Sequence, residues 1–143
     1  MPLTESHIRE MLAPLEADGM APIVASAADD LEWTIVNRRL KALPLAGVWS
    51  KQEIPKEVLG RIFACFSSFL TYKVENLLVI PEKNTAVIEM RSSGVPKDGM
   101  DYENFHCLVC EFNEEQPKPK LRRVRHYLDS ALLVNLLAGN EKL

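Results

Sequence analysis

The chain has 143 residues, of which 47% are hydrophobic and 26% are charged, and its formal net charge is −3. This length suits one domain over residues 1–143, with a core large enough to fold without a disulfide or a structural metal. The composition excludes a disordered chain, and the acidic balance gives no basic footprint for nucleic acid.

The sequence favours a cytoplasmic protein with no membrane partner. No apolar segment approaches the roughly 18 residues of a membrane span, and the N-terminal residues lack the pattern of a secretory signal. Three cysteines, an odd number, fit a reducing compartment. Cys107 and Cys110 match the C-x-x-C pattern, but residues three apart in a strand point to opposite faces. We therefore expect packed free thiols and no metal site.

The first half of the chain reads as mostly helical. Thr4 is a plausible N-cap of the first helix, and Pro14 should kink or shorten its last turn. The residues from Leu31 to Val36 alternate between apolar and polar, as in a half-buried strand. The expected elements are an amphipathic helix over 4–17, a short helix over 22–28, a strand over 31–36, an ordered loop over 37–47 and a helix over 55–70.

The second half is predicted to be β-structure. Its expected elements are strands over 72–81, 85–94, 102–112 and 121–128, followed by a short helix that begins at residue 130. Successive strands in meander order form an antiparallel sheet, so the fold class is α+β. We expect a cone-shaped curved antiparallel sheet with about three N-terminal helices packed on it, plus a short C-terminal helix. Such a sheet leaves a cavity that can hold a small-molecule substrate.

The last strand supplies the main candidate for chemistry. Alternation over 121–129 places Val124, His126 and Leu128 on one face, while Arg125 and Tyr127 lie on the other. The apolar residues mark the first face as the one that lines the cavity, with His126 as its titratable group. A histidine in a partly dry pocket can exchange protons near neutral pH, as general acid–base catalysis requires. The alternative is a buried neutral histidine bonded to a backbone carbonyl.

Two neighbouring strand segments add polar candidates. Asp129 either orients His126 as a cavity carboxylate or caps the closing helix, a position that aspartate favours, and the two roles are compatible. On the long strand, Asn104, His106 and Leu108 share one face. Asn104 can donate and accept hydrogen bonds and so can fix a substrate carbonyl. His106 faces the same cavity, either as a ligand contact or as a packed partner.

Three further residues complete the expected substrate-binding set. Trp33 is expected to form apolar wall in the pocket or core. Arg38 lies in the loop at the expected mouth and can clamp a carboxylate, although a loop arginine is more often solvated. Tyr72, like Tyr102 outside this set, is expected at the rim or in the packing. In the strand over 85–94, Ile88, Met90 and Ser92 alternate against Glu89 and Arg91. The two charged residues fall on the outer face, where we expect surface or dimer contacts.

Short pieces along nearly the whole chain together carry a family resemblance. They are Asp18–Gly19 after the first helix, Ala28–Asp30 before the tryptophan-bearing strand, Pro44–Gly47 before the third helix, Tyr102–Asn104 at the start of the long strand, and Tyr127–Ser130 at the end of the last one. In this order and spacing, the chain resembles the SnoaL-like polyketide cyclases and ketosteroid isomerase-like proteins of the nuclear transport factor 2-like fold.

The segment from Asp129 to Val134 is most similar to small fungal members that act as isomerases or cyclases on meroterpenoid and polyketide intermediates. The resemblance implies a cofactor-free isomerase or cyclase acting on a polyketide- or terpenoid-type intermediate of secondary metabolism. Proton transfer would use His126, with Asp129 and Asn104 assisting.

The resemblance also leaves alternatives open. The positions that correspond to the tyrosine, the aspartate base and the second acid of ketosteroid isomerase are Met11, Ile35 and Leu108, all apolar, which argues against steroid isomerase chemistry by that route. A non-catalytic ligand-binding or dimerisation module is one alternative, and an epoxide hydrolase is another. The strand over 102–112 is apolar on both faces at its centre, which predicts a homodimer.

Overall fold

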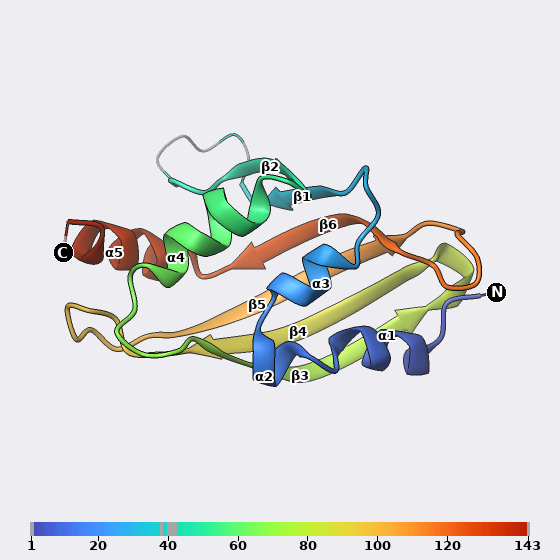
Figure 1. Ribbon diagram of the computed structural model, residues 1–143, viewed down its shortest axis with the longest axis horizontal. Coiled ribbons are helices and arrows are strands. Elements are labelled where there is room, and N and C mark those ends of the chain that lie inside the picture. The colour runs from blue at the N-terminus through green and yellow to red at the C-terminus, as the bar shows by residue number, and fades with distance from the viewer. Residues whose placement is uncertain (1, 38, 40–42, 143) are drawn as a thin grey trace.

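The computed structural model describes residues 2–37, 39 and 43–142. Six strands form one curved sheet in the order β2-β1-β6-β5-β4-β3, and α1 to α4 cross it on one side (Figure 1). The strands are β1 (Glu32–Ile35), β2 (Gly47–Ser50), β3 (Thr71–Ile80), β4 (Thr85–Ser93), β5 (Glu103–Phe112) and β6 (Leu121–Leu128). The helical elements are α1 (Glu5–Leu12), α2 (Leu15–Asp18), α3 (Ala21–Ala25), η1 (Ile54–Gly60), α4 (Arg61–Phe63), η2 (Pro81–Lys83) and α5 (Ser130–Asn140).

The predicted α+β class is confirmed, with helices near the N-terminus and one at the C-terminus. The expectation of a wholly antiparallel sheet is wrong for one pair, because β1 and β6 run parallel while every other neighbouring pair is antiparallel. Parallel pairing needs a long connection between the two strands. Here that connection is the whole chain from β2 to β5, so the first and last strands meet in the middle of the sheet.

The N-terminal helices follow the expected local signals. Thr4 caps α1, since its side chain accepts a hydrogen bond from the His7 backbone N–H at 3.1 Å. The helix stops at Leu12, and a separate turn, α2, begins after Pro14. A proline inside a helix removes a backbone donor and clashes with the preceding turn. The predicted helix over 4–17 is therefore two short helices.

Two element predictions need correction. The residues 47–50, for which the sequence predicts no strand, form β2, which extends the sheet beyond β1. The predicted helix over 55–70 ends at Phe63, because the next residues bond to the β4–β5 connection instead. The Ser67 N–H donates to the Val95 carbonyl at 2.8 Å, and the Lys97 N–H donates to the Cys65 carbonyl at 2.8 Å.

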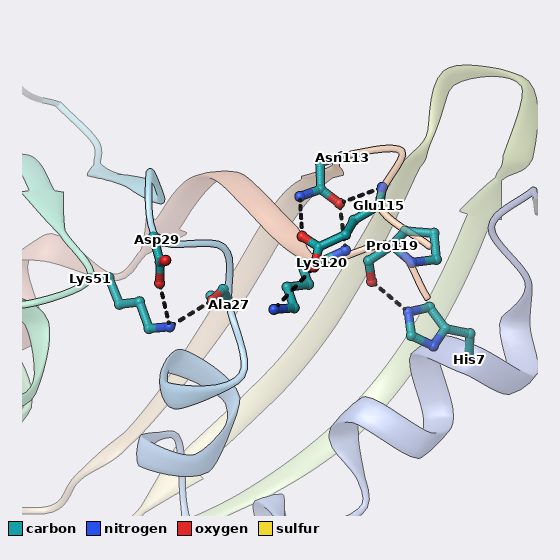
Figure 2. A network of polar contacts seen from close by, with 8 residues as sticks. All are labelled: His7, Ala27, Asp29, Lys51, Asn113, Glu115, Pro119 and Lys120. Atoms are coloured by element: carbon teal, nitrogen blue, oxygen red, sulfur yellow. Dashed lines mark hydrogen bonds and ion pairs between the residues drawn. The ribbon is translucent and has the colours of Figure 1, made fainter. Parts of the chain in front are cut away.

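The connection between β5 and β6 is an ordered loop tied to α1 (Figure 2). The Asn113 side-chain oxygen accepts from the backbone N–H groups of Glu115 and Lys120, at 3.1 and 2.8 Å. The His7 ring nitrogen Nε2 lies 2.8 Å from the Pro119 carbonyl, to which it donates. These contacts hold both ends of the loop and so help to fix the register between β5 and β6.

Alternation along the strands separates an inner face from an outer one. On β4, the inner residues Ala86, Ile88, Met90 and Ser92 are all at most 2% exposed. Opposite them, the outer face of the sheet carries charged and aromatic side chains open to solvent. No helix among the described residues is long and apolar enough to cross a membrane.

Candidate functional site

A narrow cavity lies between the helices and the inner face of the sheet. Its volume is about 50 Å³. Its apolar wall comes from both layers and includes Met20, Val24, Leu45, Ile54, Val58, Leu59, Met90, Leu108 and Leu133. Its polar side chains are Trp33, Tyr72, Ser92, Tyr102, His106 and His126. Among the described residues that line it, none is an aspartate, glutamate, lysine or arginine.

Strand register brings the polar side chains together. His126 on β6 lies opposite Leu108 on β5, and His106 lies opposite Leu128. The two histidines therefore occupy diagonal positions on the inner face of neighbouring strands, within reach of one another. On the other side, the parallel partner β1 places Ile35 opposite His126. Alternation then puts Trp33 on the same inner face, two residues earlier.

Four of these side chains form a continuous chain of hydrogen bonds. The Trp33 Nε1–H donates to His126 Nδ1 at 3.1 Å. His126 Nε2 and His106 Nδ1 are 2.8 Å apart. His106 Nε2 and Ser92 Oγ are also 2.8 Å apart. The Trp33 and His126 rings meet edge to face, with centroids 5.8 Å apart.

The direction of this chain follows from its first donor. An indole N–H can only donate, so Nδ1 of His126 carries no proton and a neutral His126 holds its proton on Nε2. That N–H donates to Nδ1 of His106, which leaves the proton of a neutral His106 on Nε2, pointing at Ser92. The lone pairs of both imidazoles are thus occupied in the resting arrangement.

Burial keeps both imidazoles neutral. It lowers the pKa of His106 to about 4. Burial also lowers the pKa of His126 well below its usual value, and a charge on the neighbouring His106 would lower it further. Desolvation penalises the charged form of a base, and two like charges at this separation repel. At neutral pH the pair therefore exists as two neutral rings.

Asn104 lies beneath the cavity and is fully engaged. It is completely buried. Its Oδ1 accepts from the Asp129 backbone N–H at 3.0 Å, and its Nδ2 lies 3.3 Å from both the Asp129 carbonyl and the Tyr102 hydroxyl. The side chain thus joins the inner face of β5 to the start of α5 and to Tyr102. None of its atoms contributes to the lining of the cavity.

Asp129 takes the capping position that aspartate favours. Its carboxylate accepts from the Leu132 N–H at 3.1 Å as the N-cap of α5, and the residue is exposed and outside the cavity lining. Of the other predicted binding residues, Trp33, Tyr72 and Leu108 line the cavity. Arg38 lies outside the described residues.

Of the three positions compared with ketosteroid isomerase, two line the cavity and one does not. Ile35 and Leu108 line the cavity, whereas Met11 borders a separate surface groove. Cys107 and Cys110 are free and differ in burial, as strand alternation requires. The described part of the chain contains no cluster of histidine, cysteine or carboxylate side chains arranged to hold a metal ion.

Two polar residues of the cavity escaped the sequence prediction as site residues. Ser92 was placed on the apolar inner face of its strand by alternation, and a lone serine among apolar neighbours was the available signal. Tyr102 was assigned to the rim or packing. It is 7% exposed, and burial raises the pKa of its hydroxyl, while the nearby side chains of Asn104 and Ser92 lower that pKa.

Comparison with known proteins identifies solved structures that share this architecture. No protein-family model and no curated protein matches the chain. An NTF2-like protein from Burkholderia thailandensis E264 superposes with a TM-score of 0.72 at 21% identity, over 92% of this chain and 95% of that one. PrhC from Penicillium brasilianum gives 0.71 at 11%, covering 93% and 86%. A protein from Jannaschia sp. CCS1 that is named "putative SnoaL-like polyketide cyclase" gives a TM-score of 0.67 at 13% identity, covering 97% of this chain and 98% of that one.

The chain therefore has the NTF2-like fold, and the resemblance to SnoaL-like proteins that the sequence carries is confirmed at the level of architecture. A fold alone does not determine a reaction, which must be argued from the site.

Proposed function

We propose that the protein is a cofactor-free isomerase or cyclase that acts on an apolar, carbonyl-bearing intermediate of the polyketide or terpenoid type. The observation that carries this proposal is the pair of neutral histidines, 2.8 Å apart, in a cavity otherwise walled by apolar side chains. A neutral imidazole is a general base near physiological pH, and an apolar wall keeps competing water away from a reactive enolate.

Proton uptake by the pair requires a change in its hydrogen bonds. Both imidazole lone pairs are occupied, one by the Trp33 N–H and the other by the His126 N–H. The bond from Trp33 is the longer of the two, 3.1 Å against 2.8 Å. A ligand that enters between Trp33 and His126 would replace it and expose Nδ1 of His126. That nitrogen would take a proton from the carbon beside the carbonyl and return it elsewhere on the ligand.

Enolisation of a small ketone tests this proposal directly. The probe is 2-indanone in deuterium oxide, with the loss of the proton signals beside its carbonyl followed by NMR. The wild-type protein should accelerate exchange above the buffer rate. His126→Asn retains an acceptor for Trp33 but has no basic nitrogen, so it should reduce the acceleration roughly 100-fold, within the range typical of general acid–base catalysis.

The matched control is His7→Asn, which removes a histidine that lies outside the cavity and bonds to Pro119. This control should exchange the ketone as fast as wild type. Equal acceleration by wild type and His126→Asn would show that His126 is not the base.

A non-catalytic ligand-binding module is the second candidate, and the size of the cavity favours it. A volume of about 50 Å³ is well below the roughly 300–1,000 Å³ of typical small-molecule pockets. A ligand must therefore displace side chains such as Met20 and Met90, whose flexible thioethers adapt readily. Binding of 2-indanone without accelerated exchange would support this candidate. The epoxide hydrolase alternative lacks support, since no carboxylate lines the cavity among the described residues.

Self-association is a separate proposal, carried by the outer face of the sheet. Phe105 and Tyr127 are 58% and 45% exposed there. Arg91 lies beside them, paired with Glu75 at 2.6 Å and Glu103 at 3.4 Å. This face thus offers both signs of charge around an apolar centre, which a second copy of the same face can match. We propose a homodimer that buries it.

Light scattering at micromolar concentration tests the dimer. The wild type should have twice the mass of one chain, and the double variant Phe105→Glu/Tyr127→Glu should be monomeric because it places charges in the apolar centre. Phe69→Glu is the control, since Phe69 is 64% exposed but belongs to the segment after α4. A monomeric wild-type protein would contradict the proposal.

A further inference from the structure

The chain of hydrogen bonds ends on a hydroxyl that is free to donate. Ser92 Oγ accepts the Nε2–H of His106, so its own O–H remains available. Ser92 lies near the Tyr102 hydroxyl and lowers the pKa of that group. The Tyr102 oxygen accepts from Asn104 Nδ2 at 3.3 Å. Because Asn104 donates to the Tyr102 oxygen, the Tyr102 hydroxyl keeps its own O–H available to donate. No hydrogen bond among the described residues uses that donor.

A second phenol lies beside the first. Tyr72 on β3 is directly opposite Ser92 on β4, which is in turn opposite Asn104 on β5. Both tyrosines line the cavity, and the Tyr72 hydroxyl forms no hydrogen bond among the described residues. Burial raises the pKa of both hydroxyls, which therefore stay protonated through the physiological range.

We propose that Tyr102 is the residue that binds the ligand, through a hydrogen bond from its hydroxyl to the ligand's carbonyl oxygen, with Tyr72 donating beside it. The inference rests on the proposed function and names the group that recognises the substrate. Ser92 and the histidines behind it are positioning residues, since Ser92 lies near the Tyr102 hydroxyl and the histidines hydrogen-bond to Ser92 and to one another. Aligned hydrogen bonds in a low dielectric polarise one another, which strengthens the last donor of the series.

This geometry defines a ligand class. The cavity offers donors without a paired acceptor, so a ligand needs an acceptor oxygen. Its wall of apolar side chains makes the burial of a full charge costly. A neutral ketone or quinone satisfies both conditions. An amine would bring donors to face donors, and a carboxylate would pay the cost of desolvating a charge.

The infrared stretch of a bound carbonyl measures this hydrogen bond. The probe is 2-indanone labelled with carbon-13 at the carbonyl, and saturation is followed by the quenching of Trp33 fluorescence in a Trp49→Phe background. The stretch in the wild-type complex should lie below its value in an alkane solvent. Tyr102→Phe should return the stretch toward the alkane value and weaken binding about tenfold, as the loss of one hydrogen bond predicts.

Three further variants distinguish the residue that donates to the carbonyl from the residues that position it. Ser92→Ala should reduce the shift without abolishing it, because Tyr102 keeps its O–H but loses the polarising series. Tyr72→Phe should also reduce it in part. Tyr127→Phe, on the outer face, should leave it unchanged. A shift that survives Tyr102→Phe, or that is lost entirely in Tyr72→Phe, overturns the assignment of Tyr102.

The same measurements distinguish failure of this inference from failure of the proposed function. Accelerated exchange with an unshifted carbonyl stretch overturns the inference and leaves the proposed reaction standing. Absence of saturable binding overturns both.

Nitrogen-15 NMR tests the series of hydrogen bonds from Trp33 to Ser92 without any ligand. His106 and His126 should each carry the proton on Nε2 at neutral pH. Trp33→Phe removes the donor that imposes this choice, so His126 should then show the Nδ1–H form in part. Detection of an Nδ1–H form for either ring in the wild type would overturn the direction of the chain and, with it, the donor role of Tyr102.

Discussion

Acidification from about pH 7 to pH 5 is expected to lower the free energy of unfolding by about 2 kcal/mol through His106 alone. The pKa of this residue falls from an ordinary 6.5 to about 4 on folding, because burial disfavours the imidazolium. In the unfolded chain, His106 therefore binds a proton below about pH 6.5. In the folded protein, His106 binds that proton only below about pH 4. The stabilisation is complete above the unfolded pKa and disappears as the pH falls through this window.

His126 adds to the loss in the same direction. Its pKa is lowered first by burial and second by His106, so protonation of either ring makes protonation of the other harder. The fixed direction of the hydrogen bonds acts with these effects. A proton added to Nδ1 of His126 would face the Trp33 N–H, and one added to Nδ1 of His106 would face the His126 N–H.

Urea unfolding at intervals between pH 7 and pH 5 measures the effect. The lower limit keeps the experiment above the range in which unfolded carboxylates titrate. The double variant His106→Leu/His126→Leu is expected to lose stability at neutral pH, because Trp33 and Ser92 lose partners, but its stability should hardly change with pH in this window. A wild-type protein whose stability is equally flat would show that the pair is not buried in neutral form.

Replacement of Asn104 by alanine is expected to cost about 3 kcal/mol of stability. The side chain satisfies the Asp129 backbone N–H and carbonyl and the Tyr102 hydroxyl, and it is completely buried. The substitution removes three hydrogen bonds and leaves a void in their place. Because Asp129 is the N-cap of α5, the start of that helix should loosen as well.

Chemical denaturation gives the magnitude, and hydrogen exchange of the α5 amides gives the location. Asn135→Ala is the matched control, since Asn135 lies on the same helix but is exposed. It should change stability by a few tenths of a kcal/mol at most, as expected for an exposed helical position. A loss below about 1 kcal/mol for Asn104→Ala would mean that water replaces the amide without difficulty.

The sequence predicted the fold where local patterns decide it. Alternation gave the correct inner face for β5 and β6, and the bounds of β6 match the prediction. The end of α4 and the presence of β2 were missed for the same reason. Each depends on a partner far away in sequence, the residues 95–97 in one case and β1 in the other. No breaker residue marks the end of the helix at Phe63.

The site shows the same division. His126 and His106 were each assigned to the cavity from strand parity. Their direct contact depends on the register between β5 and β6, which the loop around Asn113 helps to set, and periodicity carries no information about register. Ser92 became visible as a site residue only when the register between β4 and β5 placed it diagonally across from His106. For Asp129, the geometry shows the helix-cap role.

The Trp33–His126 hydrogen bond also constrains how the protein folds. It joins residues separated by 93 positions, across the parallel pair β1 and β6. Contacts of such long range form late, because the entropy of closing so large a loop must be overcome first. The pairing of β6 with β1 thus completes both the sheet and the cavity. During synthesis, Trp33 can form its hydrogen bond to His126 only after nearly the whole chain has been made. In refolding experiments, Trp33 fluorescence should report that last step.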